Sequence, residues 1–352
     1  MKHIRILSLA LLAIAALASC KSTSTNTKKQ ASQGQPYEII IVAGNDEWGS
    51  TLSDTLQSVL KETIPVLNSP EPLYTTSRIH PNSYDGMLRL HRNILLVEAN
   101  EKYEAPAIHA QYDVTAAPQI IVSLTGPDVK SMTQYVSDYR KELQTIFEAA
   151  ERNRSLAINR STENKTLGAK IFDKFGFNIV IPNTYLEAEA NAREDFMWLR
   201  KHYNEAEQGI IIYKYPYTGN DDFTRDSLLN RRNEFVARIE GSNAGSHMTT
   251  APVFKPLLAY KRIHGRNWAE MRGFWDMEGD YYGGPFVSYS TLDRATQQVI
   301  TIDMYILSPN HGKMKRNYYR QLEHLMFSVS FPEDKAVKVE AKADTTAVAA
   351  EQ

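Results

Sequence analysis

Apolar residues in the body of the chain form two kinds of pattern, short continuous runs and longer stripes. Runs of five or six apolar residues bounded by Pro, Gly or polar positions predict buried strands. Stripes with an apolar residue every three or four positions predict helices that bury one face. The first part has run-type segments at 38–42, 93–98 and 119–124 and stripe-type segments at 50–61 and 125–153. We interpret 36–155 as an N-terminal α+β domain.

The second part of the body orders these patterns differently. Helical spacing is found at 163–175, 222–240 and 315–329. Strand character is found at 177–181, 209–215, 254–263, 268–277, 286–291 and 299–307, while 194–201 fits helix or strand. A run of strands with helices at either end predicts a mainly antiparallel sheet covered by helices on one side. We interpret 156–332 as a C-terminal α+β domain, so the predicted fold class is α+β with two α/β-layered parts.

The first twenty residues have a pattern of their own. A short basic head precedes an apolar run over 6–17, which is too short to cross a bilayer as a helix. The small residues Ala18 and Ser19 follow, and then Cys20, the only cysteine in the chain. This order resembles the lipobox of bacterial lipoproteins. The resemblance implies a lipoprotein signal peptide over 1–19, its cleavage before Cys20, and palmitate-type acyl chains on that residue; an ordinary secretory signal with a chance cysteine is the alternative.

Two polar segments flank the body. Residues 21–35 are rich in Ser, Thr, Lys and Gln and predict, together with a lipidated Cys20, a flexible tether over 20–35. Residues 333–352 are dominated by Lys, Glu and Ala and predict a disordered tail. No later segment has the roughly 20 apolar residues that a spanning helix needs. We therefore expect a water-soluble body that contacts a membrane through the lipid on Cys20.

Charge and cysteine content exclude several classes of protein. The chain has 40 Lys and Arg against 41 Asp and Glu, so no net field favours nucleic acid as a partner. An acylated cysteine forms no internal disulfide and is no nucleophile. We find no GxSxG, Walker, GxGxxG or HExxH motif. The sequence therefore points to no catalytic residue, no metal site and no cofactor.

The densest group of aromatic and polar residues lies at 268–289. Aromatic faces rimmed with carboxylates bind sugars or peptides, and an arginine among them can clamp an anion. The competing and favoured interpretation is that alternating aromatic side chains pack one face of a sheet. The candidate ligand groove consists of Trp268, Arg272, Trp275, Tyr281 and Tyr282.

A second group, Asn-Asp-Glu-Trp-Gly at 45–49, follows the first predicted strand. Paired carboxylates beside Trp48 fit a glycosidase or a sugar site. Adjacent carboxylates in one chain tend to point apart, however. Capping of the next helix by Asp46 or Ser50 is the simpler role.

A third group lies at 80–93 and includes His80, Asp85 and His91. These residue types bind metal ions or carry protons. Their spacing matches no known metal pattern, and the Pro, Asn and Gly residues between them predict turns. We interpret the segment as a polar loop that leads into the strand at 93–98.

Several of these segments together resemble the DUF4837 lipoproteins of Bacteroidota. The resemblance rests on the lipobox, EIIIVAGNDEW at 38–48, RNILLV at 92–97, PQIIVSL at 118–124, FNIVIP at 177–182 and RGFWDMEGDYYGGPFVS at 272–288. It extends over nearly all of the mature body. The family's function is unknown, so the resemblance implies no catalytic residue. It implies a Gram-negative cell envelope, and the absence of acidic residues in 21–27 favours the periplasmic face of the outer membrane.

Three hypotheses for function follow. The leading one is a non-catalytic, lipid-anchored envelope protein that binds an envelope protein or a glycan. The first alternative is a periplasmic hydrolase of glycan or cell-wall material that uses carboxylates of the Asp46-Glu47 loop or of the 276–280 stretch. Two carboxylates must then face one cleft about 5–10 Å apart. The second alternative is a carrier of a small apolar or aromatic ligand, which needs an apolar cavity.

Overall fold

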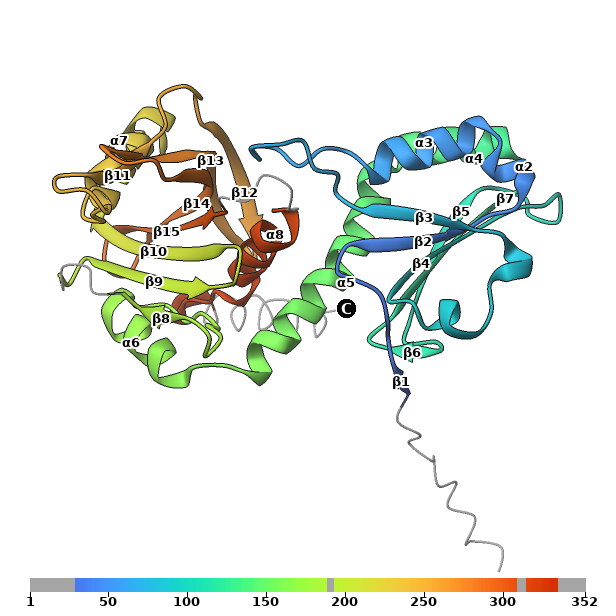
Figure 1. The fold of residues 1–352 in the computed structure, drawn as a ribbon, viewed down its shortest axis with the longest axis horizontal. Helices are drawn as coiled ribbons and strands as arrows, with labels where there is room; N and C mark the ends of the chain where they lie inside the picture. The colour runs from blue at the N-terminus through green and yellow to red at the C-terminus, as the bar shows by residue number, and fades with distance from the viewer. Residues whose placement is uncertain (1–28, 189–192, 309–314, 335–352) are drawn as a thin grey trace, which may run out of the picture.

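Two sheet-containing domains lie side by side in the structure, a computed structural model that describes residues 29–188, 193–308 and 315–334 (Figure 1). The predicted signal peptide, Cys20, most of the predicted tether and most of the predicted tail lie outside these residues. The long helix α5 (Arg140–Ser161) runs from one domain towards the other. The domain boundary expected between residues 155 and 156 therefore falls inside a helix. The fold class is α+β, as predicted.

The N-terminal domain is built on a mostly parallel sheet. Its strands lie in the order β3-β2-β4-β7-β5, with β5 antiparallel at the edge. The strands are β2 (Glu38–Val42), β3 (Thr75–Ile79), β4 (Asn93–Ala99), β5 (Ala107–Tyr112) and β7 (Ile120–Gly126). Three helices bury one face of the sheet: α3 (Thr51–Leu60), α4 (Val129–Asp138) and the first half of α5. The strands predicted at 38–42, 93–98 and 119–124 are confirmed.

The opposite face of this sheet is only partly covered. Short 3-10 segments, η1 (Pro81–Ser83) and η2 (Gly86–Leu90), lie beside a small cluster of apolar residues from β2, β4 and β7. Most of β5 is exposed. Parallel sheets are usually covered on both faces. In this domain, by contrast, part of the second face is open to solvent.

Residues 29–35, which we assigned to the tether, belong to the N-terminal domain. The short strand β1 (Gln30–Ala31) pairs in parallel with β6 (Ala116–Ala117). The backbone N–H of Gln33 then donates to the carbonyl of Leu90 at 2.9 Å. The hydrophobic pattern could not predict this, because hydrogen bonds and not buried apolar side chains hold these polar residues in place.

The C-terminal domain contains a curled antiparallel sheet (Figure 1). Its strands lie in the order β11-β13-β14-β15-β10-β9-β8, and β12 also pairs with β13. Their bounds are β8 (Leu186–Glu187), β9 (Phe196–His202), β10 (Glu207–Pro216), β11 (His247–Thr250), β12 (Leu257–Ile263), β13 (Arg266–Glu278), β14 (Gly283–Asp293) and β15 (Gln298–Leu307). The predicted antiparallel arrangement is confirmed.

Helices cover both faces of this sheet, and the prediction of cover on one side is wrong. The helices α6 (Lys165–Phe175) and α8 (Arg316–Leu325), with η4 (Met326–Ser328), pack on one face. On the other face lies α7 (Arg225–Val236), preceded by η3 (Asn220–Phe223). Central strands such as β10 are apolar at both odd and even positions, because both of their faces are buried.

Two further predictions are corrected by the structure. The expected helix over 125–153 is divided at Tyr139 into α4 and α5, and its cap is Asp128, whose side chain accepts from the N–H of Ser131 at 2.9 Å. The segment 177–181 forms no strand; Asn178 makes an isolated bridge with Ser330. By contrast, the helix expected over 163–175 is confirmed as α6, and Gly176 ends it in the left-handed conformation. None of the helices in the described part of the chain combines the length and apolar character required to cross a bilayer.

Candidate functional site

The structure does not assemble the predicted groove. Trp268 is buried in the core beneath α6 and α8, whereas Trp275 is buried in the core beside α7. The indole N–H of Trp275 donates to the carbonyl of Ile306 at 3.1 Å. Alternate residues of a strand point to opposite faces, and these two tryptophans, seven positions apart on β13, must therefore diverge. The packing interpretation is the correct one for both.

The other groove residues are also separated. Tyr281 is 99% exposed and Tyr282 is 41% exposed in the turn after β13. Arg272 lies near the middle of β13, with its side chain among residues of α8. Of the predicted groove, only Arg272 lines one of the pockets described below.

The carboxylates proposed for a hydrolase do not meet. Asp46 and Glu47 belong to the short helix α2 (Asn45–Trp48) of the N-terminal domain. The 276–280 group lies at the end of β13 beside β11, at the far side of the C-terminal domain (Figure 1). There Asp280 accepts the backbone N–H of Ser242 at 2.8 Å. These residues have local structural roles and share no cleft.

The segment 80–93 shows no metal site. Its residue His80 accepts the backbone N–H of Asn82 at 3.2 Å and so caps η1. Within residues 29–188, 193–308 and 315–334, no group of at least three His, Cys, Asp or Glu side chains is arranged to hold a metal ion. The loop interpretation fits the observed structure.

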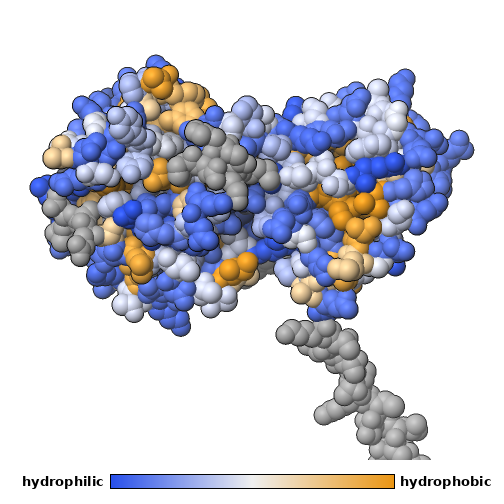
Figure 2. All heavy atoms as spheres, in the orientation of Figure 1, coloured by the Kyte–Doolittle hydropathy of each residue, from blue (hydrophilic) through white to orange (hydrophobic). Residues whose placement is uncertain are grey.

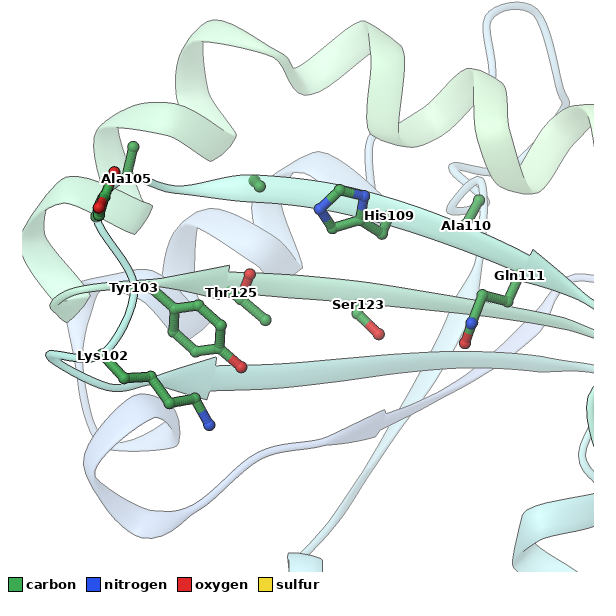
Figure 3. Close-up of a pocket in the computed structure, with 10 residues that line it drawn as sticks. Lys102, Tyr103, Ala105, His109, Ala110, Gln111, Ser123 and Thr125 are labelled. Carbon is green, nitrogen blue, oxygen red and sulfur yellow. The ribbon is translucent and has the colours of Figure 1, made fainter.

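An open hollow lies over β5 and β7 of the N-terminal domain (Figure 3). Its wall includes Lys102, Tyr103, His109, Ser123 and Thr125 (Figure 3). Its lysine, Lys102, is exposed and already paired with the carboxylate of Glu98 at 2.5 Å. Solvent-exposed ion pairs contribute little energy, and we consider another pocket the better candidate.

That pocket is a cleft of about 640 Å³ between the two domains, beside α8. Its N-terminal wall consists of α5 and residues around Ile64 and Leu73. Its C-terminal wall consists of β12, β13, β14, α8 and η4. Ligand sites occur preferentially between domains. We refer to this pocket as the interdomain cleft.

One face of α8 anchors the cleft to the N-terminal domain. Arg316, Arg320 and His324 follow one another at four-residue spacing, which places them on one face of the helix. The guanidinium of Arg320 lies 4.3 Å from the centre of the Tyr37 ring and 5.3 Å from that of Tyr74. The cation is thereby held between aromatic rings of the other domain.

A chain of alternating charges follows on the C-terminal side of the cleft. Arg272 donates through Nε to Glu270 at 2.8 Å and also pairs with Glu323 of α8. The ammonium of Lys261 lies 2.6 Å from the second oxygen of Glu270. Burial of Glu270 disfavours its charged form, but Arg272 and Lys261 outweigh this effect and lower its pKa to about 2. The carboxylate is therefore ionised at neutral pH.

On the N-terminal side of the cleft, His324 of α8 contacts Glu148 of α5. The Nε2 atom of His324 lies 2.9 Å from Glu148 Oε1, and Glu148 also pairs with Arg320. Burial, and then the charge of Arg320, lower the pKa of His324 to about 3. The ring is therefore neutral at physiological pH, and the contact with Glu148 places its hydrogen on Nε2. Its Nδ1 is then an acceptor, buried without a hydrogen-bond partner among the described residues.

Positive charge exceeds negative charge among the described residues of the cleft. The carboxylates are those of Glu148, Glu270 and Glu323, each already paired with a cation. The cations are Arg152, Lys261, Arg262, Arg272 and Arg320.

Arg152 is one of two cleft cations that are left without a carboxylate partner among the described residues. It makes no ion pair within the part of the chain that the structure describes; its guanidinium lies 4.0 Å from the centre of the Phe327 ring. Burial lowers its pKa, but a guanidinium keeps its proton in proteins. Arg262 donates to the carbonyl of Gly265 at 3.0 Å, which leaves its charge unneutralised as well. A half-buried cation that lacks an acid partner is suited to hold an anionic group.

A smaller pocket of about 270 Å³ lies on another side of α8. It includes Lys201, whose ammonium lies 4.7 Å from the centre of the Tyr203 ring and 5.7 Å from that of Tyr185. The hydroxyls of both tyrosines donate to Gln208, at 2.9 and 2.8 Å. Burial lowers the pKa of Lys201. This pocket is smaller than the usual ligand cavity, and charged and amide side chains form part of its lining, so it does not provide the apolar cavity that a carrier needs.

Comparison with protein families divides the chain in two. Residues 164–328 match the model of a domain of unknown function, DUF4837. The C-terminal domain belongs to the DUF4837 family. Residues 32–160 match a different model, also a domain of unknown function, DUF8532. The DUF4837 resemblance that we expected over nearly all of the body is therefore confined to its C-terminal part, and the segments at 38–48, 92–97 and 118–124 lie within the second match. No curated protein matches the chain.

The cleft combines residues from both matched regions. The DUF4837 region supplies β12, β13 and α8, while Glu148 and Arg152 come from the DUF8532 region. Our sequence analysis missed every cleft residue except Arg272. The available signal was the four-residue spacing of Arg316, Arg320 and His324, which places three basic side chains on one face of a helix.

Proposed function

We propose that the protein is a lipid-anchored, non-catalytic binding protein of the bacterial envelope, whose interdomain cleft receives an anionic group such as a carboxylate or a phosphate ester. In this proposal the acyl chains on Cys20 hold the body at the periplasmic face of the outer membrane. The ligand belongs to an envelope protein or a glycan that carries such a group. The single observation that carries the proposal is the Arg152 guanidinium, half-buried in the cleft and without an acid partner among the described residues.

The chemistry of the cleft favours an anion over other ligands. A guanidinium presents donors in a planar fork that matches carboxylate and phosphate oxygens. The other cations of the cleft, Lys261, Arg262, Arg272 and Arg320, lie on β12, β13 and α8 of the opposite wall. The carboxylates are already neutralised by Arg272, Lys261 and Arg320. An entering anion would therefore meet Arg152 and Arg262 without competing for a partner.

The titration behaviour of the cleft favours binding over acid–base catalysis. A general acid or base works best with a pKa near the operating pH. In the cleft, the pKa of Glu270 is lowered to about 2 and that of His324 to about 3. Both groups therefore keep one protonation state throughout the neutral range. Groups with a fixed charge state are suited to hold a ligand.

Thermal stability in the presence of anions tests the proposal. A ligand that binds only the folded protein raises its melting temperature. We expect phosphate and citrate to raise the melting temperature of the wild-type full chain. They should have little effect on Arg152→Gln. The matched control is Arg160→Gln, which changes an exposed arginine of the same helix and should respond like wild type. An equal response of Arg152→Gln and wild type would contradict the proposal.

A further inference from the structure

The point at which the chain enters the N-terminal domain restricts where that domain can lie. Lys29 is the first residue that the structure describes, and it follows Cys20 by nine positions. Nine residues reach at most about 30 Å when fully extended, at 3.3–3.6 Å per residue. If Cys20 carries lipid, as the proposed function requires, Lys29 lies within that distance of the lipid surface. The tether is thus much shorter than the sequence predicted, because 29–35 are part of the fold.

Three segments meet where the chain enters. The ammonium of Lys29 donates to the carbonyl of Asp113. The hydroxyl of Thr115 donates to the carbonyl of Arg89 at 2.5 Å, which joins the 112–119 loop to η2. The contact of Gln33 with Leu90 joins η2 to the entering chain. This end of the domain is therefore one continuous surface.

Large apolar side chains are exposed on these segments. Met87 of η2 is 66% exposed. Tyr112, at the end of β5, is 56% exposed, and Val114 beyond it is 44% exposed. Figure 2 shows apolar residues exposed on one face of the N-terminal domain. We call Met87, Tyr112 and Val114 the apolar end surface.

We propose that the apolar end surface docks on the lipid bilayer, with its side chains in the boundary between headgroups and acyl chains. The short tether keeps this surface at an effective concentration on the order of millimolar relative to the membrane. An affinity too weak to hold a free protein is then sufficient. The N-terminal domain thereby takes a fixed orientation on the membrane.

Apolar contact carries the docking, because charges at this end nearly cancel. Lys29 and Arg89 are exposed cations, and Asp85 and Asp113 lie on the same segments. Attraction to anionic headgroups requires clustered basic residues, which this surface does not have among the described residues. Docking is therefore expected to change little when the salt concentration is raised.

Site-specific labelling of the lipid-modified full chain tests the docking. Cys20 is the only cysteine, and its sulfur is blocked by the lipid, so an introduced cysteine is the single free thiol. The test variants Met87→Cys and Val114→Cys receive an environment-sensitive dye. The matched controls are Val253→Cys and Tyr281→Cys, at positions 92% and 99% exposed in the C-terminal domain. All four are reconstituted into vesicles of phosphatidylethanolamine and phosphatidylglycerol that contain a nitroxide-labelled lipid.

We expect dyes at 87 and 114 to shift to shorter wavelength and to be quenched at least twofold more than dyes at 253 and 281. Equal quenching at all four positions, with the protein still floating with the vesicles, would overturn the docking and leave the anchor intact. A dye shift that depends on protein concentration and occurs without vesicles would assign the surface to a second copy and would also overturn it. Failure to float, with no acyl group on Cys20 by mass spectrometry, would overturn both the docking and the anchor.

Discussion

Glu71 of the N-terminal domain accepts the backbone N–H of Arg316, the first residue of α8 in the C-terminal domain, at 2.8 Å. Its other carboxylate oxygen accepts the N–H of Lys315, also at 2.8 Å. The side chain of the N-cap residue, Lys315, makes no capping hydrogen bond of its own. The N–H groups at a helix start need acceptors, and a negative charge there is favourable. One domain thus completes a helix of the other.

Glu71→Ala should destabilise the folded protein more than the removal of an exposed carboxylate does. The substitution leaves two buried N–H groups without acceptors, and we expect a loss of about 2–4 kcal/mol in the free energy of unfolding. Glu71→Gln keeps one acceptor oxygen and should lose less. Urea unfolding measures both. The control, Glu101→Ala, removes an exposed carboxylate and should change the free energy of unfolding little. If Glu71→Ala loses no more stability than this control, Glu71 does not cap α8.

The core of the C-terminal domain contains a buried ion pair. Removing one of its charges should destabilise the protein more than removing both. Arg232 of α7 donates to Asp303 of β15 at 2.8 Å, and both side chains are fully buried. Arg232 also lies 3.7 Å from the centre of the Phe286 ring and donates to Thr250. Arg232→Ala leaves Asp303 uncompensated and should cost about 3–5 kcal/mol.

The double variant Arg232→Met with Asp303→Leu removes both charges and should recover most of that loss. Urea unfolding of the single and double variants completes the cycle. If the double variant is as unstable as Arg232→Ala, packing and not the unpaired charge explains the loss. If Arg232→Ala leaves the free energy of unfolding unchanged, the ion pair contributes nothing to stability.

Acid should weaken the contact between α8 and the N-terminal domain. The pKa of His324 falls from its usual 6.5 to about 3 in the folded protein. Between these values the unfolded chain binds more protons than the folded one, so the free energy of unfolding decreases as pH falls from about 6.5 towards 3. The decrease reaches at most about 1.4 kcal/mol per pH unit for one group. Glu270 acts in the same direction below its usual pKa of 4.5.

His324→Gln keeps a polar side chain but removes this titration. We expect the free energy of unfolding of the variant to change less than that of wild type between pH 7 and pH 5. Urea unfolding at several pH values measures the difference. Glu270 is present in both proteins and titrates mainly at lower pH, so it serves as an internal control. Identical slopes for variant and wild type in this range would exclude His324 as the source.

Strongly patterned elements were predictable from the sequence. The apolar run at 38–42 is β2 over the same residues, and Gly176 ends α6. β3 was missed because Thr-Thr-Ser-Arg-Ile at 75–79 has no apolar run, and its pairing with β2 is set by backbone hydrogen bonds. The sequence already argued against the predicted groove. Trp268 and Trp275 are an odd number of positions apart, so on one strand they point to opposite faces of the sheet.

The cleft was beyond prediction for a different reason. Arg152 and Arg262 lie on α5 and β12, in regions that match two different families. Local patterns describe each element and its buried face, but not how one domain packs on the other. The arrangement depends on contacts such as that between Glu71 and Arg316, which join residues far apart in the sequence.

The most direct test of the central claim is a crystal structure of the protein soaked with selenate, with the anion located by its anomalous scattering. We predict a peak in the interdomain cleft within hydrogen-bond distance of the Arg152 guanidinium, and its loss in Arg152→Gln crystals of the same form. Well-ordered wild-type crystals with selenate only on exposed surfaces, and none beside Arg152, would contradict the account.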